Sequence, residues 1–315
     1  MNQQILQLKQ ELSKAVIGQE SMIEGLLIGL LCEGHILVEG VPGLAKTTTI
    51  NAFSKALGLD FKRIQFTPDL LPSDIIGAQI YNPQDHSFSI KKGPLFTHLL
   101  LADEINRAPA KVQSALLEVM QERQVTIAEE TFKLASPFLV MATQNPIEQE
   151  GVYALPEAQL DRFMMKIIVK HNTAAQEVKI MRKGASKSFA EVQKVLSIEA
   201  LHALQKALAQ VHIDEELELY IVQLITATRE PDAFNLTSLS QSIMFGASPR
   251  ASIDLYKAAK AKAFLRGNDF VTPADIGYVV HDVLRHRIVL SYEARAKGVS
   301  TDEIISTIIE TLPIP

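Results

Sequence analysis

The spacing of apolar positions changes partway along the chain. Apolar side chains recur every three or four positions in residues 5–15 and 23–31, which predicts two helices before the first strand. Short apolar runs then alternate with helix-periodic stretches as far as residue 169. The runs predict strands, and the stretches between them predict helices. Strands are expected at residues 35–38, 61–66, 99–102, 138–143 and 164–169, and helices at 48–57 and 109–122.

This alternation predicts an α/β fold. Helices that separate short, wholly apolar strands imply a parallel sheet covered by helices on both faces. Two stretches interrupt the alternation and are typical of hairpins: residues 78–82 pair with 87–91, and residues 124–127 pair with 131–134. Hairpins added to an α/β core tend to be functional appendages.

Beyond about residue 171 the strand signals largely stop. The remaining chain has helical periodicity, and this change predicts a domain boundary. We therefore expect a nucleotide-binding core with its N-terminal helices and hairpins at residues 1–170, and a helical domain at residues 171–315. The helices of the second domain are expected at residues 174–183, 198–211, 215–228, 249–265 and 273–288.

Composition narrows the class of protein. The chain has 315 residues, of which 47% are hydrophobic, so it can bury a sizeable core and is long enough for two domains. The net charge of −5 gives no general basic field, which makes nucleic acid unlikely as the principal ligand. The single cysteine, Cys32, is expected as a buried thiol. A polar N-terminus and the lack of a membrane-length apolar run predict a cytoplasmic protein without membrane insertion.

Residues 40–47, Gly-Val-Pro-Gly-Leu-Ala-Lys-Thr, join the first strand to a helix-forming stretch. This is the context of a phosphate-binding loop, whose glycines let backbone N–H groups turn toward phosphate oxygens. Lys46 would supply charge to the β- and γ-phosphates of ATP, and Thr47 would offer a hydroxyl to Mg²⁺. The relaxed pattern arises by chance in roughly 0.15 of chains of this length, so an ordinary turn remains open. The candidate nucleotide-binding residues here are Gly40, Val41, Pro42, Gly43, Leu44, Ala45, Lys46, Thr47 and Thr48.

Ala45 departs from the usual loop, which has glycine before the lysine. A methyl group is tolerable if this residue has helical φ, because only a positive φ strictly demands glycine. The departure weakens the pattern without excluding a phosphate-binding loop.

Two carboxylates, Asp103 and Glu104, follow the apolar strand at residues 99–102. Opposite a phosphate loop, Asp103 can hold the Mg²⁺ shell and Glu104 can polarise the water that attacks the γ-phosphate. A strand that merely leaves the core through charged residues is the plainer alternative. The position of the two carboxylates downstream of the phosphate loop favours a role in ATP hydrolysis.

Two further polar residues are candidates for catalysis. Asn145 follows the third strand at the sheet edge where α/β folds bind ligands, and it can reach the attacking water or the γ-phosphate. Alternatively, Asn145 is simply a turn residue before Pro146. Arg162 can pair with Asp161 or Glu157, or it can project into a neighbouring subunit's nucleotide. The histidines form no ligand-like cluster, so no metal is expected except the magnesium that accompanies ATP.

Four long stretches resemble the MoxR family of AAA+ ATPases: residues 40–47, 63–77, 93–122 and 142–163. The resemblance covers nearly the whole chain, and alanine before the loop lysine is common in that family. It implies a P-loop AAA+ parallel sheet sandwiched by helices, a helix-two insert hairpin and a C-terminal all-α lid domain. The two hairpins then resemble those that face the pore in similar ring assemblies.

The resemblance also implies roles for individual residues. Asn145 resembles the sensor-one residue, Arg162 resembles an arginine finger acting in trans, and Arg250 resembles the sensor-two arginine. Related groups rearrange the lid, so whether Arg250 acts in cis or in trans stays open. The segment expected on the adenine side consists of Val16, Ile17, Gly18 and Gln19.

The implied activity is ATP hydrolysis by a chaperone-like machine that remodels, assembles or matures partner proteins. Self-association into a ring, expected as a hexamer, and a partner with a von Willebrand factor A domain belong to the same expectation. A magnesium-chelatase-like motor subunit and a DNA-acting AAA+ motor are the nearest alternatives. A small-molecule kinase or a non-enzymatic scaffold would fit less of the pattern.

Overall fold

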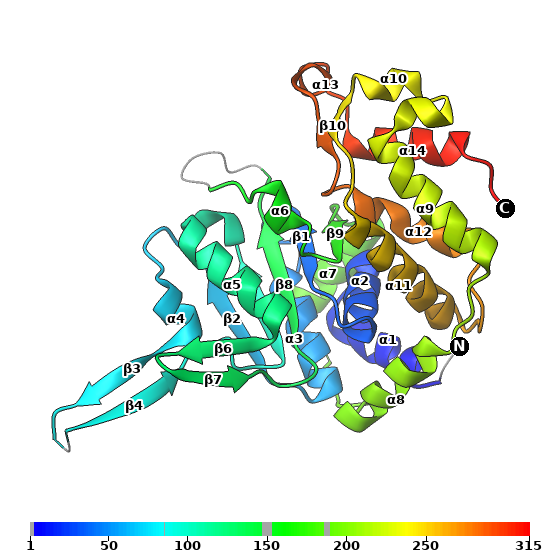
Figure 1. The fold of residues 1–315 in the computed structure, drawn as a ribbon. Helices are drawn as coiled ribbons and strands as arrows, with labels where there is room; N and C mark the ends of the chain where they lie inside the picture. Colours follow the sequence, from blue (N-terminus) through cyan, green and yellow to red (C-terminus); the bar gives the residue numbers. More distant parts are fainter. Residues whose placement is uncertain (1–2, 85, 147–152, 186–189) are drawn as a thin grey trace.

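The computed structural model describes residues 3–84, 86–146, 153–185 and 190–315. A five-stranded sheet in the order β2-β5-β8-β1-β9 forms the centre of the first half of the chain, and its strands are parallel (Figure 1). This confirms the predicted α/β fold, and every predicted sheet strand lies within two residues of its observed position. The strands are β1 (Ile36–Glu39), β2 (Phe61–Gln65), β5 (Leu99–Asp103), β8 (Leu139–Gln144) and β9 (Met165–Ile168).

The sheet separates two hydrophobic clusters. Alternate residues of a strand point to opposite faces, so in β5 Leu99 and Leu101 join one cluster while Leu100 and Ala102 join the other. Burial on both faces explains why the central strands are apolar without alternation. One face packs against the N-terminal helices and the helix that follows β1, and the other packs against α5. These helices are α1 (Gln3–Ala15), α2 (Glu20–Leu31), α3 (Lys46–Leu57) and α5 (Ala110–Glu122).

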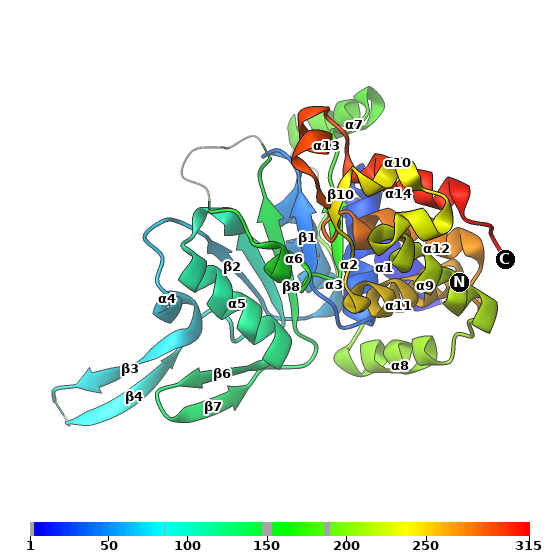
Figure 2. The same ribbon diagram turned by 45° about the horizontal axis from the view of Figure 1, so that its top comes forward.

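Two antiparallel hairpins leave this core, as the sequence predicted. The first consists of β3 (Gly77–Asn82) and β4 (Ser87–Lys92), follows the short helix α4 (Pro72–Ile76), and extends away from the body in both views (Figures 1 and 2). The second consists of β6 (Gln124–Ile127) and β7 (Glu130–Lys133) and directly follows α5. Ile80, Tyr81 and Phe88 are exposed on the first hairpin.

The second half of the chain is mainly helical, as expected. It also contains a two-stranded sheet that the sequence pattern did not indicate, because its strands have only three and two residues. The elements are α7 (Ala174–Ala185), α8 (Ile198–Ala209), α9 (Glu215–Arg229), α10 (Thr237–Ser240), β10 (Ile243–Phe245), α11 (Pro249–Arg266), α12 (Pro273–Leu284), β11 (Val289–Leu290), α13 (Tyr292–Ala296) and α14 (Thr301–Thr311). Three short elements complete the described part of the chain: η1 (Ile105–Arg107), α6 (Glu157–Leu160) and η2 (Pro231–Phe234).

The predicted helix at residues 273–288 is present, but its predicted C-terminal end was wrong. Helix α12 stops at Leu284, and the next residues turn toward the core. There His286 bonds the carbonyl of Phe163, and the Arg287 guanidinium donates to the same carbonyl. These contacts with distant residues end the helix, although its apolar periodicity continues.

The helical second half packs directly on the core. One hydrophobic cluster runs from Ile5 in α1 to Leu312 at the end of α14 and includes residues of α2, α8 and α11. These helices lie together in the ribbon view (Figure 2). Cys32 lies at this junction; its thiol donates to the carbonyl of Lys257 at 3.4 Å, and burial raises the pKa of Cys32 to about 12. In the described part of the chain, no helix combines the length and apolarity needed to span a bilayer.

Candidate nucleotide-binding site

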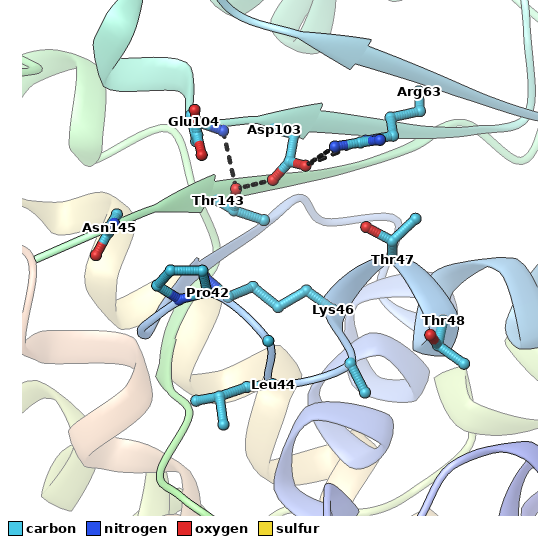
Figure 3. A pocket seen from close by; sticks show the side chains of 12 residues that line it. Pro42, Leu44, Lys46, Thr47, Thr48, Arg63, Asp103, Glu104, Thr143 and Asn145 are labelled. Atoms are coloured by element: carbon cyan, nitrogen blue, oxygen red, sulfur yellow. Dashed lines mark hydrogen bonds and ion pairs between the residues drawn. The ribbon is translucent and has the colours of Figure 1, made fainter. Parts of the chain in front are cut away.

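The glycine-rich loop after β1 borders a cavity of about 380 Å³ at the carboxyl edge of the sheet (Figure 3). Helix α3 begins at Lys46, so its first N–H groups and the positive end of its dipole face this space. The ends of three strands supply the opposite wall. The lining residues are Pro42, Gly43, Leu44, Ala45, Lys46, Thr47, Thr48, Arg63, Asp103, Glu104, Thr143 and Asn145.

Ala45 adopts φ 57° and ψ 21°, so the condition under which alanine would be tolerated without strain, a helical φ, is not met. The chain must reverse immediately before α3, and a left-handed residue achieves this within one position. For a residue with a Cβ this costs about 1–2 kcal/mol. The Ala45 carbonyl is fixed by two hydrogen bonds from Thr49, one from the backbone N–H at 2.8 Å and one from the hydroxyl at 2.9 Å. Bonds within the first turn of α3 therefore hold the strained peptide in place.

Lys46 reaches back over the loop. Its Nζ donates to the carbonyl of Gly40 at 2.5 Å. Partial burial lowers the pKa of Lys46, while the charges of Asp103, Glu104 and Glu39 oppose this shift. The ammonium thus faces an acidic wall across a cavity bordered by backbone N–H groups, an arrangement suited to a polyphosphate with a divalent cation.

Asp103 and Glu104 are held by side chains from two neighbouring strands. Thr143 on β8 donates to Asp103 Oδ1 at 2.6 Å and accepts from the Glu104 backbone N–H at 2.9 Å. Arg63 on β2 donates to Asp103 Oδ2 through Nη2 at 2.7 Å and through Nε at 3.1 Å. The first carboxylate is therefore fixed from both sides (Figure 3).

Glu104 turns away from Asp103 because its backbone is left-handed, with φ 57° and ψ 49°. Its Oε2 accepts from Gln65 Nε2 at 2.6 Å and from Arg107 Nε at 3.1 Å. Adjacent carboxylates thus have separate partners and separate positions along the cavity wall. That separation suits one of them to hold a cation and the other to hold a water molecule.

Sequence reasoning did not single out Arg63, Gln65 or Thr143. The signal lies in the sheet register, since Gln65 is level with Asp103 and Ala142 is level with Ala102. Polar residues at these strand ends must meet at one edge, but the strand order has to be known first. Asn145, which was predicted, does line the cavity and is largely buried.

Arg162 and Arg250 do not border the cavity of their own chain. Arg162 lies along α5, where its Nη1 donates to the carbonyl of Leu117 at 2.9 Å. Arg250 donates through Nη1 to Asp161 Oδ2 at 3.3 Å. The pairing of Arg162 with Asp161, one of the alternatives from sequence, is not what the structure has, because Asp161 bonds Ser248, Arg250 and Arg287 instead.

The predicted adenine-side segment borders a second cavity of about 460 Å³, between the end of α1 and α7. Val16, Ile17 and Gly18 line it, and Gln19 Nε2 donates to Asn172 Oδ1 at 3.3 Å. The chain after β9 connects the two cavities, because Val169 lies against Gly40 of the loop and Asn172 lies against Gly18. Residues 169–172 therefore link the predicted adenine-side segment to the glycine-rich loop, but the two do not line the same cavity.

The donor set fits magnesium with nucleotide. The Thr47 hydroxyl and the Asp103 carboxylate both line the loop cavity, and hard oxygen ligands of this kind, completed by phosphate oxygens and water, are what Mg²⁺ takes. In the ranges that the structure describes, no cluster of three or more His, Cys, Asp and Glu side chains could hold another metal.

Comparisons with known proteins agree with this geometry. Residues 35–165 match the ATPase family associated with various cellular activities (AAA), and residues 236–308 match the AAA lid domain. The chain is 48% identical to Chaperone MoxR1 of Mycobacterium tuberculosis, covering 97% of this chain and 81% of that protein. It is 30% identical to Protein MoxR of Methylorubrum extorquens, over 98% of this chain and 94% of that protein. A crystal structure of a proposed ATPase from Cytophaga hutchinsonii superposes with a TM-score of 0.93 at 52% identity, covering 99% and 95%. The chain belongs to the MoxR family of AAA ATPases.

Proposed function

We propose that this protein hydrolyses ATP in the loop cavity and uses the energy to remodel partner proteins. The observation that carries the proposal is the meeting of Lys46, Asp103 and Glu104 at one cavity beside the N-terminus of a helix. Backbone N–H groups of the loop and Lys46 would hold the phosphates. Thr47 and Asp103 would hold magnesium, which would supply charge shielding on the phosphate oxygens.

Glu104 is the residue proposed to orient and deprotonate the attacking water. Its carboxylate is kept apart from Asp103 by the left-handed backbone and is held at Oε2 by Gln65 and Arg107. Asn145, at the end of β8 in the same cavity, can hold the other side of that water or the γ-phosphate. Positioning by these two groups is the main contribution a protein makes to phosphoryl transfer.

A neighbouring subunit is proposed to complete the site. The cavity contains Arg63, whose guanidinium bonds Asp103, while Arg162 lies outside it, after α6, and donates to the carbonyl of Leu117 in α5. A trans arginine of this kind is worth about 10³–10⁵-fold in related phosphoryl-transfer systems. The proposal therefore includes a ring, expected as a hexamer, in which Arg162 of one subunit faces the ATP of the next.

The remodelling part of the proposal rests on the relatives and on the exposed hairpin. One relative is named a chaperone, and the β3–β4 hairpin presents Ile80, Tyr81 and Phe88 to solvent far from the sheet. A partner with a von Willebrand factor A domain is the expected associate. The negative net charge disfavours a DNA-acting motor.

The test measures ATP binding and phosphate release across protein concentrations for the wild-type protein and for Arg162→Ala. Wild-type turnover per subunit should rise with concentration as rings form, while Arg162→Ala should bind ATP normally and hydrolyse it at least about 10³-fold more slowly. Turnover that is independent of concentration in a strictly monomeric sample would instead favour a self-sufficient kinase-like enzyme.

The client can be sought with Glu104→Gln, which should bind ATP without hydrolysing it. A ring blocked before hydrolysis should retain its client during affinity purification in the presence of ATP. Lys46→Ala, which should not bind ATP, serves as the matched control. Recovery of only small-molecule metabolic enzymes, equally with both variants, would contradict the remodelling role.

A further inference from the structure

Arg287 is a buried arginine between the lid and the core. It lies after α12, only 1% of its side chain is exposed, and its guanidinium has two carboxylates as partners. Nε donates to Asp161 Oδ1 at 2.9 Å, and Nη2 donates to Asp254 Oδ2 of α11 at 2.5 Å. Arg287 therefore joins a lid helix to the segment that precedes β9.

Arg287 also bonds backbone carbonyls on both sides of Arg162, while its Nη1 donates in addition to the carbonyl of Val283 in α12 at 2.9 Å. Nη2 donates to the carbonyl of Asp161 at 3.2 Å and to that of Phe163 at 2.9 Å, and Nη1 donates to that of Met164 at 3.4 Å. The neighbouring His286 bonds the Phe163 carbonyl at 2.9 Å. The main chain that carries Arg162 is thus fixed from the lid.

The Arg162 side chain itself has a looser connection. It is half-buried, and within the described residues its guanidinium makes one hydrogen bond, from Nη1 to the carbonyl of Leu117. Because the backbone of Arg162 is held firmly and its guanidinium only lightly, the side chain can turn outward while the Arg162 Cα stays in place. The contacts that fix the backbone of residues 161–163 therefore set the direction in which the Arg162 side chain can turn.

A second contact from the lid acts on the same segment. Ser248, at the start of α11, donates through Oγ to both carboxylate oxygens of Asp161, at 3.0 and 2.9 Å, and Arg250 donates to Oδ2. Burial raises the pKa of Asp254, and the charge of Arg287 opposes that shift. A buried ion network of this kind is a poor source of stability compared with apolar packing, so its value lies in the geometry that it imposes.

We propose that Arg287 is a positioning residue for Arg162: it fixes the backbone around Arg162 to the lid, so the lid of one subunit sets where that arginine meets the next subunit's ATP. This inference rests on the proposed trans role of Arg162. It assigns no contact between Arg287 and nucleotide.

Arg285 provides a matched control. It lies two positions earlier at the end of α12, it is nearly as buried, and it also links the lid to a core carbonyl, that of Lys166 at 2.7 Å. Its carboxylate partners are Asp282 and Asp302 of the lid. In the part of the chain that the structure describes, the Arg285 guanidinium makes no hydrogen bond to residues 161–164. Replacing it tests loss of a buried lid–core arginine without loss of support for Arg162.

The experiment uses full-length Arg287→Lys, Arg287→Met and Arg285→Lys proteins. ATP affinity is measured by titration with a fluorescent ATP analogue, and turnover by phosphate release. Arg287→Lys should bind ATP with wild-type affinity and hydrolyse it about 10- to 100-fold more slowly, because displacement of a catalytic group by about 1 Å is enough for such a loss. Arg285→Lys should keep turnover within about threefold of wild type.

Mixed rings then locate the defect. Glu104→Gln subunits cannot hydrolyse ATP but carry an intact Arg162 and Arg287. Mixing them with Arg287→Lys should raise phosphate release several-fold, because the variant's own sites then receive a correctly placed arginine from the neighbour. The double variant Glu104→Gln/Arg287→Lys should fail to raise the turnover of Arg162→Ala, although Glu104→Gln alone raises it.

Three outcomes would overturn the assignment: unchanged turnover in Arg287→Lys, loss of ATP binding in both Arg287 variants, or absence of rescue by Glu104→Gln. The last two would mean that Arg287 serves its own subunit's fold or site. Rescue of Arg162→Ala by Glu104→Gln is measured in parallel. If that rescue fails, the trans role in the proposed function is wrong; if it succeeds while Arg287→Lys is not rescued, only the role of Arg287 is wrong.

Discussion

Two non-glycine residues at the cavity, Ala45 and Glu104, have left-handed backbone torsions. Such strain costs of order 1–3 kcal/mol per residue and persists where the surroundings fix it. At Ala45 it turns the chain into α3, and at Glu104 it directs the second carboxylate away from the first. Sequence alone did not reveal either torsion, because neither residue type indicates a positive φ.

Ala45→Gly should therefore raise the free energy of unfolding by about 0.5–1 kcal/mol, since glycine adopts this torsion without the Cβ clash. Urea denaturation measures the change. Ala203→Gly is the control, because Ala203 is exposed within helix α8, where glycine should instead lower the free energy of unfolding by about 1 kcal/mol. A lower stability for both variants would show that Ala45 is not strained.

His35 links β1 to two other elements as a buried neutral imidazole. Its Nδ1 accepts from the backbone N–H of Val140 at 3.0 Å, so Nε2 carries the proton and donates to the carbonyl of Met120 at 3.0 Å. Burial lowers the pKa of His35 from 6.5 to about 4. The folded state therefore resists a proton that the unfolded chain accepts.

We expect the free energy of unfolding to be highest above pH 6.5 and to fall as the pH drops toward 4, with about 3 kcal/mol lost to His35 by the end of this range. The sign follows because the pKa is lower in the folded state. Urea denaturation at several pH values tests it. His35→Gln should reduce the dependence of the free energy of unfolding on pH. It should not abolish this dependence, because burial also lowers the pKa of His286. His212→Gln, at an exposed position, is the control. An equal slope in all three proteins would contradict the assignment.

At the scale of elements, local pattern was sufficient for the sheet and both hairpins but not for the end of α12 or for β10 and β11. The strands of the sheet are apolar on both faces, and that signal is present in each strand by itself. The end of α12 is decided by bonds from His286 and Arg287 to the carbonyl of Phe163, more than a hundred residues away in the sequence. The candidate site divides in the same way: Lys46 belongs to a local loop pattern, and Asp103, Glu104 and Asn145 stand at the ends of apolar strands, whereas Arg63 and Thr143 depend on strand order.

The base of the first hairpin depends on Gly77. Its φ is 107°, and a Cβ there would lie 2.3 Å from the carbonyl oxygen of Lys91 and 2.7 Å from the backbone nitrogen of Gly93. Gly77→Ala should lower the free energy of unfolding by more than about 2 kcal/mol. Gly277→Ala is the control, because among the described residues a Cβ at that position in α12 would have no neighbour within 4 Å outside its own helix. Alanine there should raise the free energy of unfolding by up to about 1 kcal/mol. Wild-type stability for Gly77→Ala in urea denaturation would contradict this account of the hairpin.

At the scale of the whole molecule, the division at residue 170 separates two kinds of secondary structure but not two hydrophobic cores. The cluster that contains α1, α2 and α3 continues into α8, α9, α11 and α12. The Arg287 network crosses the same boundary. The lid is therefore packed against the core like one more layer, and sequence periodicity alone could not reveal this continuity.

The core and lid should accordingly unfold together. Scanning calorimetry of the protein without nucleotide is expected to give one endothermic transition whose calorimetric and van't Hoff enthalpies agree. Arg285→Lys, which weakens one lid–core contact, should lower the transition temperature without splitting it. Two resolved transitions in the wild-type protein would mean that the shared cluster does not couple the halves.

The most direct test of the account compares ATP binding and phosphate release by the wild-type, Glu104→Gln and Lys46→Ala proteins under conditions that favour assembly. Lys46→Ala should lose binding. Glu104→Gln should bind ATP with wild-type affinity and release phosphate about 10²–10⁴-fold more slowly, because the group that activates the water is gone while the phosphate loop is intact. Wild-type phosphate release by Glu104→Gln would contradict the central claim that this cavity hydrolyses ATP through Glu104.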